Sequence, residues 1–240
     1  MKKTRGLPFV FINVAMTADG KIAPANRHFE PFGSARDRHH LLELRATADA
    51  VISGARTVDL DSVNLGPGPA RYRRERVRRR LAEYNLRIIV SGAGTIDPDA
   101  EIFKHNFSPI IILATARISR AHLARLRSLA DEVKICGATE LDFEMAFRWL
   151  REKWQVDRLL CEGGGELNSA LFKAGLVDEI HLTLCPLLMG GRTAPTLSDG
   201  IGVDRLAEAA RFKLASRKRI GSELFLVYRR LTRSASGRGV

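Results

Sequence analysis

The residues best suited to chemistry lie in short motifs that follow apolar, strand-like segments. The most informative motif is 162–166, Glu-Gly-Gly-Gly-Glu, directly after the apolar run 159–161. Apolar residues at helical spacing follow, from Leu167 to Ala174. Consecutive glycines let backbone approach a ligand closely, and the N–H groups at a helix start favour an anion. The motif therefore predicts a seat for a nucleotide phosphate; a tight turn without a ligand is the alternative.

Three further motifs stand in the same kind of place, each after a strand-like segment. They are 15–21 (AMTADGK), 54–61 (GARTVDLD) and 91–94 (SGAG). In an open α/β sheet, ligands gather at the carboxyl ends of the strands. Each motif alone is ordinary turn chemistry, but four together indicate one shared site. The triple glycine differs from the G-x-G-x-x-G fingerprint, so a standard Rossmann site is not indicated.

Arg45 is a charged residue in an apolar setting. It lies in line with Leu41, Leu44 and Ala48 on one stripe of a predicted helix. A guanidinium there needs an anionic partner or must extend to solvent. The pattern supports two interpretations equally. One is a buried ion pair within the protein, and the other is binding of a substrate phosphate, which suits the planar guanidinium.

The chain lacks the usual nucleophile and metal motifs. No serine stands in a G-x-S-x-G elbow, and the six histidines show no H-x-x-x-H spacing. The three cysteines, at 136, 161 and 185, each close an apolar run, which favours buried, reduced thiols over disulfides or zinc. This shortage favours chemistry supplied by a cofactor, with no metal site.

The elements that must position these residues alternate between strand and helix. Helix starts are predicted at Ser34, near Ser119, at Asp142 and after the triple glycine. We expect an α/β three-layer sandwich, with a mixed, mainly parallel sheet that closes in an antiparallel hairpin around 220–223. The predicted strands are 9–15, 50–53, 86–91, 110–114, 133–136, 159–161, 179–185, 212–219 and 224–230.

Composition limits the remaining organisation. The chain has 240 residues, 45% of them hydrophobic, and no apolar stretch approaches the ~18 residues of a membrane span. We expect no signal peptide, a cytoplasmic protein that does not bind membranes, a single domain over 1–232 and a disordered tail over 233–240. The segment 66–80 is the best candidate for an irregular surface insertion, because its Gly-Pro-Gly-Pro start suits neither a helix nor a central strand.

The chain is strongly basic, with a formal net charge of +12. Much of the excess lies in the run 71–80, which we interpret as a solvated helix face. Nucleic-acid binding is the alternative, and it would give a steeply salt-dependent affinity. The run carries only one aromatic residue, Tyr72, for base stacking, so we expect no nucleic-acid partner.

Taken together, the motifs resemble those of the riboflavin-biosynthesis reductases, a family that includes the reductase half of the bifunctional pyrimidine deaminase–reductase. The resemblance covers about 7–230 and implies the fold of dihydrofolate reductase. It implies hydride transfer from NADPH to the sugar of a phosphoribosylamino-pyrimidine, giving a ribitylamino product, and it implies a homodimer. The motifs that carry it are TADGKI at 17–22, LRA at 44–46, GART at 54–57, EGGG at 162–165 and GLVDE at 175–179.

The resemblance also implies roles for individual residues. We add Arg56 as a candidate for the adenosine 2′-phosphate, from its charge and position. The catalytic candidates are the acids Asp61 and Glu162, with Lys21 to hold charge in place. The implied cofactor positions are Ala15, Thr57, Asp61, Ser91, Gly163, Gly164, Gly165 and Glu166. The implied substrate positions are Arg45, as a phosphate contact, Leu65 and Glu162.

One departure from the family's pattern leaves the substrate open. Where the family often has Asp-Asp-Pro and then a leucine-threonine pair, this chain has DSVNLGP at 61–67. The substrate is either the deaminated uracil or the diamino-pyrimidine. A reductase of the same fold with another substrate, such as dihydrofolate, is an alternative, although we identify no carboxylate where a pterin would need one.

Overall fold

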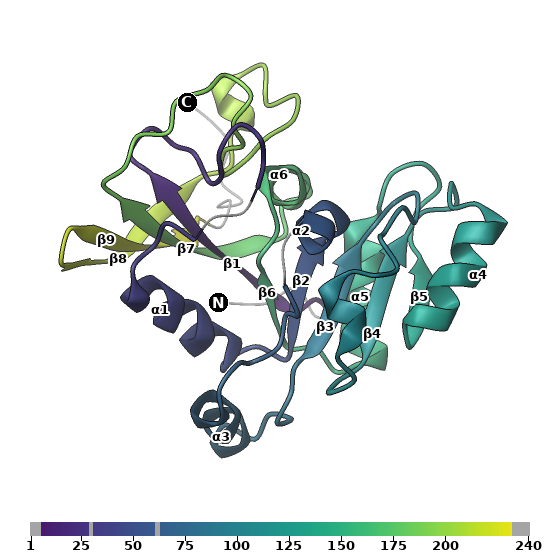
Figure 1. Ribbon diagram of the computed structural model, residues 1–240. Helices are drawn as coiled ribbons and strands as arrows, with labels where there is room; N and C mark the ends of the chain where they lie inside the picture. Colours follow the sequence, from purple (N-terminus) through teal and green to yellow (C-terminus); the bar gives the residue numbers. More distant parts are fainter. Residues whose placement is uncertain (1–5, 29–30, 61–62, 232–240) are drawn as a thin grey trace, which may run out of the picture.

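The computed structural model describes residues 6–28, 31–60 and 63–231, and within them it forms one nine-stranded sheet (Figure 1). The strands are β1 (Phe9–Thr17), β2 (Ala50–Gly54), β3 (Leu86–Val90), β4 (Ile110–Ala114), β5 (Glu132–Ile135), β6 (Arg158–Cys161), β7 (Val177–Cys185), β8 (Phe212–Ile220) and β9 (Glu223–Arg230). The helices are α1 (Ala35–Arg45), α2 (Ala55–Leu60), α3 (Ala70–Arg78), α4 (Arg120–Leu129), α5 (Phe143–Lys153) and α6 (Gly165–Lys173), with short 3₁₀ turns at Glu101–Lys104 and Leu206–Glu208.

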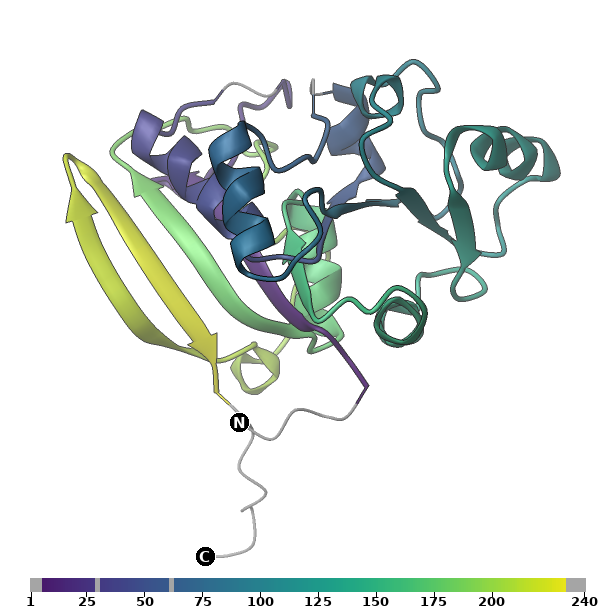
Figure 2. The same ribbon diagram turned by 90° about the horizontal axis from the view of Figure 1, so that it is seen from below.

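The order of the strands is β5-β4-β3-β2-β6-β1-β7-β9-β8. Each pairing from β5 to β7 is parallel, whereas β9 runs antiparallel to both β7 and β8. The hairpin between β8 and β9 turns over two residues, and Gly221 takes the positive φ of 59° that such turns favour. Both views place this hairpin at one end of the molecule and α4 at the other (Figures 1 and 2). The mixed, mainly parallel sheet and its closing hairpin are confirmed.

Helices pack on both faces of the sheet. Phe147 of α5 and Leu171 of α6 join one buried apolar cluster, which includes Ile12 and Leu159 of the central strands. Leu44 of α1, Val58 of α2 and Leu126 of α4 join a second cluster on the opposite face. The three-layer sandwich is therefore confirmed. The prediction of one domain over 1–232 stays a prediction, and the tail 233–240 lies outside the described residues.

Three of the four predicted helix starts are formed by local side-chain capping. The Ser119 and Asp142 side chains accept hydrogen bonds from the first turns of α4 and α5. Ser34 caps α1 by accepting from the Arg36 and Asp37 N–H groups, and its Oγ also donates to Glu223 Oε2 at 2.6 Å. The beginning of α1 is thus tied to β9, 189 residues further along the chain.

The segment 66–80 is not the irregular insertion that we expected, because most of it forms helix α3. Pro69 stands at the N-cap, outside the hydrogen-bonded helix, so the Gly-Pro-Gly-Pro start does not prevent helix formation. Nor is the basic run only a solvated face. Arg76 is fully buried, and its guanidinium donates to the carbonyls of Arg45 at 2.6 Å, Ala48 at 2.5 Å and Ala82 at 2.9 Å. Tyr72 is also buried, so its ring is not free to stack on bases.

The three cysteines lie in the protein core. Cys136, Cys161 and Cys185 are buried and free, as expected. Burial raises the pKa of the Cys161 thiol to about 12. No helix in the described ranges is long and apolar enough to cross a membrane.

Candidate active site

The carboxyl ends of β1, β2, β3 and β6, which are neighbours in the sheet, open into one cleft of about 1680 Å³. Each predicted motif contributes to the cleft wall, through Ala15, Gly54, Gly92 and Gly163. Thr57 of α2 lines the cleft as well. The four strand-end motifs therefore share a single site, because parallel strands bring their carboxyl ends to the same edge of the sheet.

The triple glycine links β6 to the start of α6. Added Cβ atoms at Gly163 and Gly165 would lie only 2.6 Å from the Leu167 side chain and 2.4 Å from the Thr196 carbonyl oxygen, so packing requires both glycines. A Cβ at Gly164 would meet only Thr57 Oγ1, at 3.8 Å. Gly164 is the N-cap of α6, and no side chain in the described chain caps that end. The helix start therefore presents free N–H groups and a positive dipole end toward the cleft.

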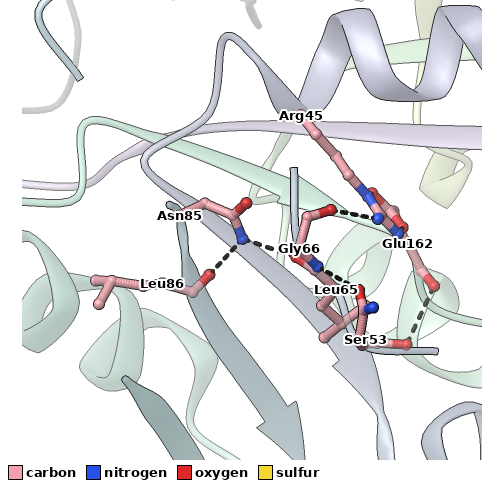
Figure 3. Close-up of polar contacts among 8 residues, drawn as sticks. Arg45, Ser53, Leu65, Gly66, Asn85, Leu86 and Glu162 are labelled. Carbon is pink, nitrogen blue, oxygen red and sulfur yellow. Dashed lines mark hydrogen bonds and ion pairs between the residues drawn. The ribbon is translucent and has the colours of Figure 1, made fainter. Parts of the chain in front are cut away.

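Arg45 and Glu162 form a buried ion pair on the adjoining wall (Figure 3). Arg45 Nε and Nη2 donate to the two carboxylate oxygens of Glu162 at 2.7 and 2.6 Å, and Nη1 donates to the Gly66 carbonyl at 2.6 Å. Burial by itself would lower the pKa of Arg45, but the Glu162 carboxylate raises it above its usual value. Both side chains line the cleft. The ion-pair interpretation of Arg45 is confirmed, and a role in binding phosphate stays a prediction.

Two of the predicted cofactor residues pair with each other at the rim of the cleft. Arg56 Nη1 donates to Glu166 Oε1 at 2.6 Å, and Arg27 approaches the same carboxylate at 3.7 Å. The Arg56 and Glu166 side chains are both exposed, so the pair is accessible to solvent and to ligands. Because exposed ion pairs contribute about 0–1 kcal/mol, an incoming phosphate can compete for Arg56 at little cost.

Three other predicted site residues, Leu65, Ser91 and Lys21, do not line the cleft. Leu65 is fully buried in the core, and its carbonyl accepts a hydrogen bond from Asn85 Nδ2 (Figure 3). Ser91 is buried between Val90 and Gly92, which line the cleft themselves. The Lys21 ammonium donates to the Ala194 carbonyl at 3.3 Å. Asp61 lies outside the described residues. The roles of these four residues stay predictions.

Sequence reasoning did not single out two polar residues of the cleft. Asp37 of α1 and Asn13 of β1 both line it. The cleft therefore contains a carboxylate next to α1 that we did not identify from the sequence. The signal was available in part, because Asp37, Leu41 and Arg45 fall on one helical stripe.

The three-layer sandwich, with a cleft at the carboxyl ends of its parallel strands, defines a fold of the dihydrofolate reductase type. Residues 8–226 match the family model described as the RibD C-terminal domain, so the chain belongs to this family. It is 32% identical to the 2,5-diamino-6-ribosylamino-4(3H)-pyrimidinone 5′-phosphate reductase of Methanothermobacter thermautotrophicus, over 92% of this chain and 97% of that protein. The protein of the same name from Archaeoglobus fulgidus is 33% identical, over 80% of this chain and 87% of the relative.

Longer relatives and solved structures agree with this assignment. The riboflavin biosynthesis protein RibD of Actinobacillus pleuropneumoniae is 28% identical, and the chain spans 56% of its length. RibD of Acinetobacter baumannii superposes with a TM-score of 0.74 at 23% identity, over 95% of this chain and 59% of that protein. A pyrimidine reductase-like protein from Corynebacterium diphtheriae superposes with a TM-score of 0.77 at 22% identity, over 94% and 92% of the two chains. These superpositions confirm the fold.

Proposed function

We propose that this chain is an oxidoreductase of riboflavin biosynthesis, which reduces the ribosyl group of a phosphoribosylamino-pyrimidine to the ribityl form with NADPH. Membership of the RibD C-terminal family and the names of the relatives support the reaction. The observation that carries the proposal is the cleft itself, because it joins an uncapped helix start to a buried Arg45–Glu162 pair. The first element suits the phosphates of a dinucleotide, and the second suits a phosphorylated substrate.

The open position at Gly164 fits a nicotinamide dinucleotide. Backbone N–H groups of 163–166 donate to its pyrophosphate in this proposal, with Thr57 beside them. Arg56 contacts the adenosine 2′-phosphate, which would select NADPH over NADH. When bound, the cofactor supplies a hydride to C1′ of the substrate sugar. The further cofactor contacts in the proposal are Ala15, Ser91 and Asp61.

Arg45 holds the substrate phosphate in this proposal, and Glu162 keeps the guanidinium oriented. The bidentate geometry of the pair leaves Arg45 little freedom to turn, so the positive charge is already in place before the substrate arrives. Reduction of an imine also requires a proton at its nitrogen. The two acids proposed as catalytic are Glu162, whose ionised carboxylate pairs with Arg45 and can stabilise the protonated imine, and Asp61.

An assay of NADPH oxidation with defined substrates tests the function. The purified chain is mixed with NADPH and, separately, the 2,5-diamino-pyrimidinone form, the 5-amino-uracil form and dihydrofolate. We expect turnover with a phosphoribosylamino-pyrimidine and none with dihydrofolate. Turnover with dihydrofolate alone would assign the chain to another reaction, and the absence of turnover with all three would overturn the proposal.

Two substitutions at Gly164 test the cofactor seat. Gly164→Asp places a carboxylate where the phosphate is proposed to bind, and we expect a loss of NADPH affinity of about 100-fold or more, since opposed like charges cost several kcal/mol. Gly164→Asn is the matched control, because it has nearly the same shape without the charge. Fluorescence titration of NADPH measures both variants, and circular dichroism verifies the fold. Equal affinity for the two variants would contradict the proposed seat.

We also propose that two copies of the chain associate as a homodimer. Ile201 is fully exposed, and Leu188 and Leu206 are 80% and 83% exposed, in the segment that leads into β8. Strand β8 is exposed from Lys213 to Arg219 and forms one of the two edges of the sheet. Exposed apolar side chains and an exposed edge strand are both typical of a protein interface.

Light scattering after size exclusion measures the assembly directly. We expect the mass of a dimer for the natural chain and that of a monomer for the double variant Ile201→Glu/Leu206→Glu. Val77→Glu is the control, because Val77 is also exposed but belongs to α3. A monomeric natural chain would contradict the proposal.

A further inference from the structure

Helix α1 presents three side chains to the cleft at intervals of one turn. Asp37, Leu41 and Arg45 all line it, at positions i, i+4 and i+8. Eight residues of helix separate Asp37 from Arg45, which corresponds to about 12 Å. This wall of the cleft therefore carries a guanidinium beside the triple glycine and a carboxyl group about 12 Å away along the helix. A ligand held by its phosphate at Arg45 extends toward Asp37.

The floor beside Asp37 contains hydrogen-bond acceptors that lack donors. Asp37 Oδ1 and Asn13 Oδ1 are buried and have no well-formed hydrogen bond among the described residues, and the Thr183 hydroxyl, which lies close enough to Asp37 to lower its pKa, can donate to at most one of them. Asn13 and Asp37 line the cleft, and Thr183 lies on β7 opposite Ala15 of β1, two residues beyond Asn13. Buried polar atoms without partners are costly, so they indicate a ligand that supplies the missing bonds. Because two of them are acceptors only, that ligand must carry N–H or O–H donors.

The chain makes room for the Asp37 carboxyl with a glycine. A Cβ at Gly33 would lie 2.3 Å from Asp37 Oδ2, so any larger residue there would displace the carboxyl group. Burial raises the pKa of Asp37, and the Glu223 carboxylate raises it further, against the Thr183 hydroxyl and Arg38, which lower it. A desolvated carboxylate in this position gains strongly from two donated N–H bonds.

We propose that Asp37 recognises the 2-amino edge of the pyrimidine and so selects the diamino-pyrimidinone over the deaminated uracil. A 2-amino-4(3H)-pyrimidinone presents its N3–H and one 2-amino N–H side by side, which matches the two oxygens of a carboxylate. The uracil presents N3–H beside the C2 carbonyl, whose oxygen repels a carboxylate oxygen. The proposal rests on the proposed function, because it assumes that a phosphoribosylamino-pyrimidine is the substrate.

The ratio of kcat/KM for the two pyrimidines tests this inference. The natural chain is expected to favour the diamino form. In Asp37→Asn, the amide offers one acceptor and one donor, which matches the N3–H and C2 carbonyl of the uracil. We expect kcat/KM for the diamino form to fall about 100-fold while that for the uracil is kept or rises, since a lost pair of charge-assisted bonds leaves buried groups unpaired.

Two further variants separate recognition from stability. Gly33→Ala keeps the carboxyl group but displaces it, so the ratio of kcat/KM values should fall in the same direction. Glu43→Gln is the matched control, because Glu43 is an exposed carboxylate on the same helix, paired with Arg36 outside the cleft. It should leave the ratio unchanged. NADPH affinity, measured by fluorescence, should be the same in all four proteins and reports that the cleft is intact.

Several outcomes would overturn the inference while the proposed function stands. The natural chain could prefer the uracil, Asp37→Asn could lower kcat/KM equally for both pyrimidines, or the ratio could stay unchanged. An equal loss would show that Asp37 supports the fold or the chemical step instead of selecting the base. If the natural chain reduces neither pyrimidine, the proposed function fails, and this inference fails with it.

Discussion

The cleft has two halves, one formed mainly by backbone at the triple glycine and the other formed by charged side chains along α1. The half at the triple glycine presents backbone, with side chains excluded by packing at Gly163 and Gly165. The half along α1 presents buried charged side chains, led by Arg45 and its partner Glu162, which lies 117 residues away in the chain. A backbone seat depends on the absence of side chains, whereas a charged seat depends on partners brought together by the whole fold. Substitutions should therefore affect the two halves in different ways.

The largest effect is expected from Arg45→Met. It leaves the Glu162 carboxylate buried without its partner, which costs about 3–5 kcal/mol of unfolding free energy. Urea unfolding measures the loss. Arg36→Met is the matched control, since it breaks the exposed Arg36–Glu43 pair and should cost about 1 kcal/mol or less. If both variants lost about 1 kcal/mol or less of unfolding free energy, the Arg45–Glu162 pair would not be important for the stability of the α1 half.

Arg76→Met tests whether α3 supports that half from behind. The buried guanidinium bonds the carbonyls of Arg45 and Ala48, and its removal should cost about 2–3 kcal/mol. Because Arg45 loses its backbone anchor, KM for the phosphorylated substrate should rise while NADPH affinity is unchanged. Arg78→Met, on the exposed side of the same helix, should alter neither value. A change in NADPH affinity alone would contradict this division of roles.

Gly165→Ala tests the glycine half. The added Cβ meets the Thr196 carbonyl oxygen at 2.4 Å, so we expect a loss of about 1–3 kcal/mol in thermal or urea unfolding. Gly164→Ala is the control at the adjacent position, where there is room for a methyl group, and its unfolding free energy should be nearly unchanged. A larger loss of unfolding free energy in Gly164→Ala than in Gly165→Ala would contradict the packing described for the turn.

An effect that shows only in the pH dependence of stability is expected beneath α1, where the His40 and His181 rings lie 5.4 Å apart. Hydrogen bonds from His181 and Arg229 lower the pKa of Glu179 to about 2. A carboxyl whose pKa is lowered in the folded state adds stability above its ordinary pKa of 4.5, and this stability is lost as pH falls toward 2. In Glu179→Gln, thermal unfolding should depend less on pH between about 4.5 and 2. Glu144→Gln, an exposed carboxylate on α5, is the control and should keep the natural dependence.

Local signals predicted most of the fold. Ser34 and Asp142 act within one turn of the helices they cap, and the β8–β9 hairpin depends on a two-residue turn. The shared cleft was predictable as well, because glycine motifs after parallel strands meet at one sheet edge. All of these features depend on residues that are neighbours in the sequence or on the general geometry of parallel sheets.

The features that could not be predicted depend on distant partners. The burial of Arg76 is decided by the carbonyls of Arg45 and Ala48, 31 and 28 residues away, so the basic run resembled an ordinary solvated face. Leu65 follows a similar logic, because its burial depends on Asn85 and the surrounding core and not on its own motif. Sequence spacing carried no trace of these contacts.

Helix α1 is fixed at both ends, at Ser34 by Glu223 and at Arg45 by Glu162 and Arg76. Because both ends are held, α1 cannot turn outward about either end without breaking one of these contacts. A widening of the cleft that keeps these contacts would occur at its rim, where ion pairs such as Arg56–Glu166 are exposed to solvent and weak. We therefore expect α1 to keep its position relative to the sheet when a ligand binds.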